Sequence, residues 1–544
     1  MTGKWFRGAS VYQIYPRSFK DSDGDGVGDL RGIIEKIDWI ADLGVDAVWL
    51  CPIYASPQAD NGYDISDYRA IHPEFGTMAD FDELVALMHR HGIKLIMDMV
   101  INHSSDEHPW FRESRSSKGS PKRSWYHWRP AGPSGPPNDW RSAFGGSAWT
   151  LDPATGEYYL HLFHEKQPDL NWECSEFREE IYATMRWWLE KGVDGFRLDV
   201  INLISKEAGY PAGGPEHYAN GPKIHEYLRE MNRQVFSPFG AMTVGETPFV
   251  DTSLCRLYTA EDRRELDMVF QFEMVDLDSG PGGKWDIKPI APSDVVGNMR
   301  KWQEALRREG WNSLFWGNHD QPRAISRFGD PATHCELSGK MLAGFLYLQR
   351  GTAFIYQGEE IGMTNTPFDS IAELRDVESL NYIEEGRARG EDLPDLFRRV
   401  KLKGRDNART PFCWDSSPNA GFTIGVPWIR VHPDYREVNA ADALRRPDSI
   451  YHFYRKLLEL RRGEDLVANG DIEFAGEPEG PLFLYRRFFD DAGGVRSLWV
   501  GGLFGDRPAS STLTSRSGGP VLCNYDRVED PLAWRPWEFR AWYE

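Results

Sequence analysis

The chain has few cysteines, no long apolar run and no excess of basic charge. Its six cysteines lie far apart and form no CxxC pair, which argues against a zinc cage or a disulfide framework. The most apolar stretch, 341–356, is interrupted by Gln349 and Arg350, so no segment reaches the roughly 18 apolar residues of a membrane-spanning helix. The N-terminal residues also lack the apolar segment of a signal peptide. We therefore expect a cytoplasmic protein that does not bind membranes.

The balance of charge excludes further classes of function. The 83 Asp and Glu residues outnumber the 63 Lys and Arg residues, which gives a formal net charge of −20. Such a surface repels polyphosphates and anionic membranes, and the sequence contains no basic stripe for nucleic acid. Hydrophobic residues make up 40% of the chain and include 21 tryptophans, which excludes a disordered protein. The composition therefore predicts an acidic globular protein with a large core.

Short apolar runs alternate with longer amphipathic stretches along most of the chain. This alternation is typical of βα units around a parallel sheet. One crossover helix is indicated at 81–92, where Thr77 and Asp80 have the spacing of a capping box. The number of apolar runs predicts a (β/α)8 barrel of the α/β class. The eight runs are residues 10–16, 45–52, 94–100, 193–200, 241–246, 268–273, 312–320 and 352–360.

Two segments depart from this alternation. Residues 104–171 are rich in Trp, His, Gly and Pro, which predicts a loop-rich subdomain inserted after the third strand. Beyond a helix expected at 449–462, strand-like pieces at 481–489 and 496–504 indicate a small antiparallel domain. We therefore expect three parts: a barrel at 1–103 and 172–478, the inserted subdomain at 104–171 and a C-terminal β-sandwich domain at 479–544.

Acidic side chains stand at the ends of three predicted strands. Asp199, Glu246 and Asp320 end the fourth, fifth and seventh runs, and in such barrels the loops after the strands face one cleft. A single strand-end aspartate is more often a turn or cap residue. Three converging carboxylates repel one another and lose solvation, which a fold tolerates mainly where function requires it.

The type of chemistry follows from these carboxylates and from the motifs that are missing. No Ser-His-Asp arrangement, Walker loop or HExxH motif competes with them, and GDGVG at 24–28 lacks the spacing of a dinucleotide site. In glycoside hydrolysis one carboxylic acid protonates the leaving oxygen and a second carboxylate attacks the anomeric carbon. The paired carboxylates and abundant aromatic residues therefore indicate an enzyme that acts on sugars.

An ordered set of motifs makes the chain resemble the α-amylase superfamily, glycoside hydrolase family 13. Within that family it resembles the branch of oligo-1,6-glucosidases, dextran glucosidases and α-glucosidases. The resemblance extends to about residue 470, whereas the C-terminal region is less distinctive. The motifs, in chain order, are VYQIYPRSF, DMVINH, QPDLN, GFRLDVINLISK, VGE, NHDQPR, YQGEEIGM and GRDNART.

The resemblance implies a role for each strand-end carboxylate. Asp199 would be the nucleophile that forms a covalent glucosyl intermediate, and Glu246 would be the general acid and then the general base. Asp320 would bond the sugar hydroxyls, and the configuration would be retained. The resemblance also implies a set of residues around the terminal glucose, each of which could instead be an ordinary core or salt-bridge residue. They are Asp60, Tyr63, His103, Phe144, Phe163, Gln167, Arg197, His319 and Arg405, with Arg409 as a rival for the last position.

Three further positions bear on specificity. In this family Val directly after the nucleophile goes with α-1,6 linkages, so the resemblance implies that Val200 favours them, although it could simply pack within its strand. Two segments depart from the pattern of the branch, namely 247–249, with Phe249, and the pair 412–413. We expect both of them near the leaving sugar.

The acidic loop at 21–29 has the pattern of a cation site. Its sequence, DSDGDGVGD, places oxygen ligands at alternate positions, as in the first half of an EF-hand. Gly32 occupies the position of the final EF-hand glutamate, so a complete EF-hand is not expected. The alternative is a solvated acidic turn, and no organic cofactor is expected. The resemblance implies a structural Ca²⁺ or Mg²⁺ held by Asp21, Asp23, Asp25, the Val27 carbonyl and Asp29.

Together these features predict a retaining exo-α-glucosidase that releases α-glucose from short α-1,6-linked glucosides such as isomaltose and panose. An α-1,4-glucosidase or a sucrose-acting glucosyltransferase or isomerase of the same family would use the same three carboxylates. A non-catalytic ancillary barrel would be expected to lack those carboxylates or to carry a transmembrane segment. The expected partner is a small oligosaccharide, not a nucleic acid or a membrane, and we expect a monomer or weak homodimer.

Overall fold

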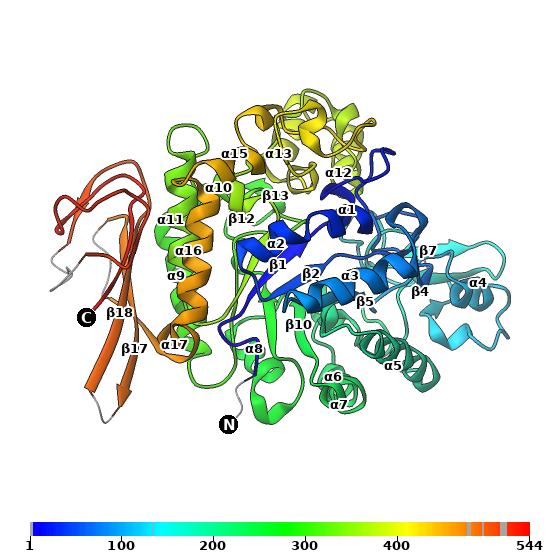
Figure 1. The fold of residues 1–544 in the computed structure, drawn as a ribbon. Coiled ribbons are helices and arrows are strands. Elements are labelled where there is room, and N and C mark those ends of the chain that lie inside the picture. The colour runs from blue at the N-terminus through cyan, green and yellow to red at the C-terminus, as the bar shows by residue number, and fades with distance from the viewer. Residues whose placement is uncertain (1–3, 134, 476–479, 492–493, 512–518) are drawn as a thin grey trace.

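A computed structural model describes all residues except 1–3, 134, 476–479, 492–493 and 512–518 (Figure 1). Its central sheet has eight parallel strands, one in each predicted run, so the predicted strands are confirmed. The predicted boundary between 478 and 479 lies outside the described residues. The eight strands are β1 (Ser10–Ile14), β2 (Ala47–Leu50), β5 (Lys94–Val100), β9 (Gly195–Asp199), β10 (Met242–Thr247), β11 (Met268–Gln271), β14 (Ser313–Phe315) and β15 (Thr352–Tyr356).

The eight strands curl into the predicted barrel. Their hydrogen-bonded order is β11-β10-β9-β5-β2-β1-β15-β14. The two outer strands of this order also meet, since the hydroxyl of Ser313 on β14 donates to the carbonyl of Val269 on β11 at 2.7 Å. The residues of β1, β2 and β9 are buried throughout, because helices cover the outer face and side chains fill the interior.

Amphipathic helices surround the barrel (Figure 1). The predicted crossover helix is α3 (Met78–Arg90), and its capping box between Thr77 and Asp80 is confirmed. No helix within the described ranges is both long enough and apolar enough to cross a membrane. The other helices that pack around the barrel include α1 (Leu30–Glu35), α2 (Ile37–Leu43), α5 (Ser175–Glu190), α6 (Ile224–Met231), α8 (Thr252–Thr259), α9 (Pro292–Ala305), α11 (Cys335–Tyr347) and α16 (Ile450–Gly463).

The segment between β5 and α5 has its own small sheet. Strands β6 (Trp128–Arg129), β8 (Glu157–Leu160) and β7 (Trp149–Asp152) lie side by side, next to α4 (Pro109–Arg115). The aromatic residues that the sequence concentrates here are largely internal, since Trp128, Trp140 and Trp149 are buried. This segment is called the inserted subdomain below.

A second long connection, between β15 and α16, lies, like the inserted subdomain, over the carboxyl end of the barrel strands. It contains α12 (Val377–Ala388), α13 (Leu393–Lys403) and α14 (Asp406–Arg409). Asp376 caps α12 by accepting hydrogen bonds from the amides of Glu378 and Ser379. Arg405 lies between α13 and α14, so this connection brings its side chain to the end of the barrel.

The chain ends in an antiparallel sheet beside α11 (Figure 1). Its two long strands, β17 (Leu482–Asp491) and β18 (Gly494–Leu503), confirm the predicted strand-like pieces. The sheet order is β16-β17-β18-β22-β20, and a separate pair, β19-β21, accompanies it. The remaining bounds are β16 (Asp471–Phe474), β19 (Ala509–Ser510), β20 (Leu522–Cys523), β21 (Ala533–Trp534) and β22 (Phe539–Tyr543).

A glycine permits the close contact between α11 and this sheet. A Cβ placed on Gly344 would lie 2.5 Å from the buried ring of Phe539 on β22. We expect Gly344→Ala to lower the free energy of unfolding by about 1–3 kcal/mol, the usual cost of overpacking. Thermal unfolding checks this, with Gly297→Ala in α9 as the matched control, because no atom lies within 4 Å of its added Cβ. The control is expected to keep or raise the Tm, and equal Tm values for both variants would contradict the packing argument.

Candidate active site

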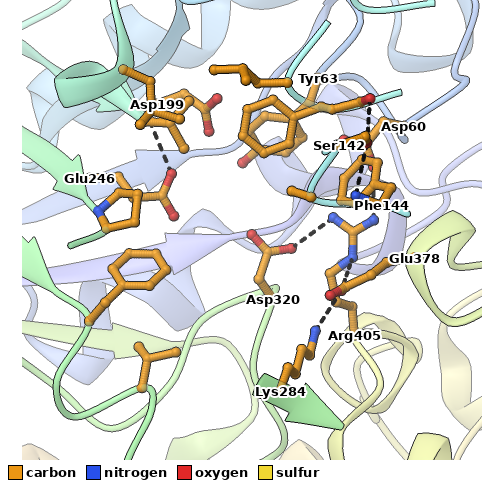
Figure 2. Close-up of a pocket in the computed structure, with 18 of the residues that line it drawn as sticks. Asp60, Tyr63, Ser142, Phe144, Asp199, Glu246, Lys284, Asp320, Glu378 and Arg405 are labelled. Carbon is orange, nitrogen blue, oxygen red and sulfur yellow. Dashed lines mark hydrogen bonds and ion pairs between the residues drawn. The ribbon is translucent and has the colours of Figure 1, made fainter. Parts of the chain in front are cut away.

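A cavity of about 480 Å³ opens at the carboxyl end of the barrel strands (Figure 2). Its wall comes from strand ends of the barrel, from the inserted subdomain and from the connection that contains α12. The structure brings most of the predicted site residues together there. Those lining the cavity are Asp60, Tyr63, His103, Phe144, Phe163, Asp199, Val200, Glu246, Asp320 and Arg405.

Arg197 lies behind the cavity wall and joins the carboxylates of three neighbouring strands. Its Nη1 is 2.9 Å from an oxygen of Asp98 on β5 and 2.6 Å from an oxygen of Asp199 on its own strand, β9. Its Nη2 is 2.6 Å from an oxygen of Glu246 on β10. The guanidinium is a rigid planar fork with five N–H donors. It therefore holds Asp199 and Glu246 at a fixed separation while compensating their charge.

The environment of Glu246 favours its protonated form. Burial raises the pKa of this carboxyl to about 8, because Asp199 and Asp320 add to the effect of burial and only Arg197 and the amide of Val200 oppose it. Burial also raises the pKa of Asp199, against the attraction of Arg197. A carboxylic acid that keeps its proton at neutral pH can act as a general acid.

Val200 contributes to the site through its backbone as well as its side chain. Its φ of 35° and ψ of 42° lie in the left-handed region, which a β-branched residue rarely adopts. This conformation points its amide at Glu246, whose Oε2 accepts the hydrogen bond at 3.2 Å. The tight turn after β9 therefore connects Asp199 with Glu246 on the next strand.

Asp320 is held in its ionised form. Burial opposes its ionisation, but the guanidinium groups of Arg409 and Arg405 outweigh burial and keep its pKa well below the usual range. Arg409 is 2.6 Å and Arg405 is 3.4 Å from the same oxygen of Asp320. The sequence left these two arginines as rivals, and the structure places both beside Asp320.

His319 is a neutral ring packed between two tyrosines. It stacks on Tyr63 with a centroid distance of 5.1 Å and on Tyr15 with one of 5.8 Å. Burial lowers its pKa to about 3. The side-chain amide nitrogen of Gln13 lies 2.8 Å from Nδ1 and donates to it. The ring proton is therefore on Nε2, which lies 3.2 Å from a carboxylate oxygen of Asp320. That N–H lies close to the Asp320 carboxylate without completing a hydrogen bond to it.

Arg405 closes the side of the cavity opposite Glu246 (Figure 2). Its guanidinium is 3.0 Å from a carboxylate oxygen of Asp60 and 2.7 Å from one of Asp376. The ring of Phe144 lies 4.8 Å from the same guanidinium. These groups are all buried. A buried ion pair with an aromatic cover makes this end of the cavity polar and closed.

Two further predicted residues, Gln167 and His103, lie beside the groups at this closed end of the cavity. The Gln167 side-chain amide donates to Asp60 at 3.2 Å and also reaches the backbone oxygen of Tyr63. His103 lies 3.1 Å from that same oxygen, and its ring packs on Phe163 at a centroid distance of 5.1 Å. Burial lowers the pKa of His103 to about 4, so the ring is neutral.

One expectation from the sequence is wrong, and several acidic partners were missed. Phe412 and Cys413 do not line the cavity: both are buried, and Phe412 packs on Phe19 and Trp414. Phe249, in contrast, lines the cavity and keeps 58% of its surface exposed. The acidic partners of Arg197 and Arg405 had no role in the predicted site, although Asp98 stands within DMVINH. They are Asp98 and Asp376, which are buried, and Glu378, which is partly exposed.

The acidic loop at 21–29 brings three of its four aspartates together. Carboxylate oxygens of Asp21, Asp23 and Asp29 lie within 4.8 Å of one another, whereas Asp25 lies outside this group. Burial raises the pKa of Asp29, and backbone amides bind both oxygens of Asp21. Clustered carboxylate oxygens are the donors that hard divalent cations prefer, so the donor set fits Ca²⁺ or Mg²⁺.

Comparisons with other proteins show which family this chain resembles. A family model described as the catalytic domain of alpha amylase matches residues 13–470. The oligo-1,6-glucosidase of Parageobacillus thermoglucosidasius is 52% identical over 557 residues, which cover 99% of this chain and 98% of the relative. The crystal structure of a Bacillus licheniformis trehalose-6-phosphate hydrolase has a TM-score of 0.93 and 45% identity, covering 99% of this chain and 100% of its own. An isomaltulose synthase from Klebsiella sp. LX3 has a TM-score of 0.96 and 40% identity, with 100% of both chains covered.

Proposed function

This chain belongs to the α-amylase family of glycoside hydrolases, and we propose that it is a retaining exo-α-glucosidase acting on short α-1,6-linked glucosides. The observation that carries the mechanism is the Arg197 fork, which holds Asp199 and Glu246 on adjacent strands. Retaining glycosidases need two carboxyl groups about 5 Å apart, one to attack and one to protonate. Two carboxyl groups bound by one guanidinium are compatible with that spacing.

In the first step an oxygen of Asp199 attacks the anomeric carbon while Glu246 gives its proton to the glycosidic oxygen. The bond between these two sugar atoms breaks, and a glucosyl ester on Asp199 forms with inverted configuration. In the second step Glu246, now ionised, takes a proton from water, and the water oxygen displaces Asp199. Two inversions release α-glucose. The ionised Asp320 accepts hydrogen bonds from sugar hydroxyls as positive charge develops on the ring.

The closed end of the cavity supports release of one glucose from the chain end. The ion pair between Arg405 and Asp60, covered by Phe144, occupies the space that a longer sugar chain would need. Its carboxylate and guanidinium groups can bind the hydroxyls of a terminal glucose. We therefore assign this end to the non-reducing glucose and the side of Glu246 and Phe249 to the leaving sugar.

The charges on the cavity wall favour a neutral leaving group. Lys284 lies 2.5 Å from Glu378, and Lys403 lies 2.7 Å from Asp278. Both lysines that line the cavity therefore already have a carboxylate partner. Proteins bind phosphate through charge-assisted hydrogen bonds from Arg and Lys, and the lining cation with the longest carboxylate contact is Arg141, 3.9 Å from Glu385. This pairing argues against a phosphorylated disaccharide.

Hydrolysis rates test this function. They are measured at equal concentrations of isomaltose, panose, maltose, sucrose and trehalose 6-phosphate. We expect isomaltose and panose to have the highest kcat/KM, with the first released glucose in the α form by NMR. Asp199→Asn is expected to reduce turnover by at least about 10³-fold without lowering the Tm, because the nucleophile is lost at almost constant volume. A preference for maltose or sucrose would overturn the linkage, and release of β-glucose would overturn the mechanism.

The proton on Glu246 predicts the alkaline limit of activity. Because burial raises its pKa to about 8, Glu246 stays protonated below that pH and loses its proton above it. We expect kcat/KM for isomaltose to fall about tenfold per pH unit above about pH 8, and also to fall on the acid side as Asp199, whose pKa burial raises, takes up a proton. A 2,4-dinitrophenyl α-glucoside has a leaving group that needs no proton. We expect the rate of its first step, measured as the burst of released dinitrophenol, to stay unchanged above that pH. A parallel fall for both substrates would assign the limit to another group.

We also propose a structural divalent cation at Asp21, Asp23 and Asp29, with Asp25 and the Val27 carbonyl as further candidate ligands. When bound, such an ion supplies charge compensation to the loop and takes no part in the reaction. EDTA is expected to lower the Tm while leaving the initial rate at 25 °C within twofold, because a cation bound to the folded state stabilises it. Added Ca²⁺ should restore the Tm in wild type and not in Asp23→Asn. An unchanged Tm in EDTA would favour the alternative interpretation, in which the loop at 21–29 is a solvated acidic turn without a bound cation.

A reducing, cytoplasmic location is part of the proposal. All six cysteines are free, and Cys51, Cys174, Cys255 and Cys413 are buried. Proteins of oxidising compartments commonly use such residues in disulfides, whereas thiols are maintained in the cytoplasm.

A further inference from the structure

Phe144 lies at the junction between the inserted subdomain and the barrel. Its amide donates to the hydroxyl of Ser142 at 3.0 Å, and that hydroxyl donates to the carbonyl of Phe163 at 2.7 Å. Both partners belong to the inserted subdomain. The carbonyl of Phe144 accepts a hydrogen bond from the opposite direction, at 3.0 Å, from the side-chain amide of Asn381 on α12. The backbone N–H and C=O groups of Phe144 are therefore held by different parts of the molecule.

Side chains on one face of α12 contact this junction and the neighbouring Arg405. Glu378, Asn381 and Glu385 have the three- and four-residue spacings that place side chains on the same side of a helix. Glu378 lies 3.5 Å from Arg405, Asn381 binds Phe144, and Glu385 lies over Gly145. A Cβ on Gly145 would lie 2.4 Å from the Glu385 carboxylate, and the φ of this glycine is +96°. The approach of α12 is thus close along its first two turns.

The same helix also fixes the guanidinium that Phe144 covers. Asp376, the cap of α12, lies 2.7 Å from Arg405. Arg405 and the ring of Phe144 are in turn in contact, at 4.8 Å. One rigid element therefore sets both the charged group and the aromatic group at the closed end of the cavity.

We propose that Asn381 is a positioning residue that sets the affinity for the terminal glucose by holding Phe144 against Arg405. This inference rests on the proposed function, which places that glucose at the closed end. Asp199 and Glu246 lie on the opposite side and are held separately by Arg197 (Figure 2). Asp320 keeps its shorter contact with Arg409, at 2.6 Å, so loss of the Asn381 hydrogen bond weakens glucose binding and leaves the bond-breaking step unchanged.

The decisive variant is Asn381→Asp, which keeps the shape of the side chain but replaces the amide donor with an oxygen facing the Phe144 carbonyl. We expect its KM for isomaltose to rise about two- to tenfold, the effect of one lost, partly buried hydrogen bond, with kcat within twofold of wild type. Asn381→Ala is expected to raise KM similarly. Glu384→Gln, an exposed change on the same helix, is the control and is expected to leave both constants unchanged.

Glucose binding measured by calorimetry separates this inference from the proposed function. We expect glucose to bind Asn381→Asp and Asn381→Ala about two- to tenfold more weakly than wild type, at an unchanged Tm. If wild type binds glucose more tightly than both variants yet hydrolyses no α-glucoside, the positioning role stands and the proposed function is wrong. Equal glucose affinity in all proteins, or a fall in kcat at constant KM, overturns the positioning role.

Discussion

The buried guanidinium of Arg197 is the interaction on which the site depends. It lies inside the barrel between Asp98, Asp199 and Glu246, which come from three adjacent strands. Removing a cation from water is costly, and removing several carboxylates at once is costlier still, unless they are paired with good geometry. The pairing here reaches the 2.6–2.9 Å of charge-assisted hydrogen bonds. The barrel supplies that geometry because parallel strands present their ends at one level.

The cations beside each carboxyl group also determine its protonation state. Asp320 faces two arginines and stays ionised. Glu246 shares its single cation with other carboxylates, so burial dominates and its pKa rises to about 8. Similar side chains thus differ in protonation because their surroundings differ, which is how one site can hold an acid and anionic groups at the same pH.

The cavity is a product of three separate segments. The strand ends provide the reacting groups, the inserted subdomain provides Phe144, and the connection after β15 provides Arg405 and α12. The second and third of these segments meet through a hydrogen bond between Asn381 and the Phe144 carbonyl and through the contact of Phe144 with Arg405. The shape of the closed end therefore depends on a junction that lies across the cavity from Glu246.

The sequence by itself determined the strands, the capping box at Thr77 and the strand-end carboxylates, because periodicity and helix caps are local properties. It also determined the family, since ordered motifs identify a fold independently of geometry. Only the tertiary structure decided which buried charges meet. Both Arg405 and Arg409 contact Asp320, while Phe412 packs into the core, and neither outcome follows from local spacing. Ion pairing and packing of this kind join residues that lie from tens to hundreds of positions apart, so their partners are set by the folded chain as a whole.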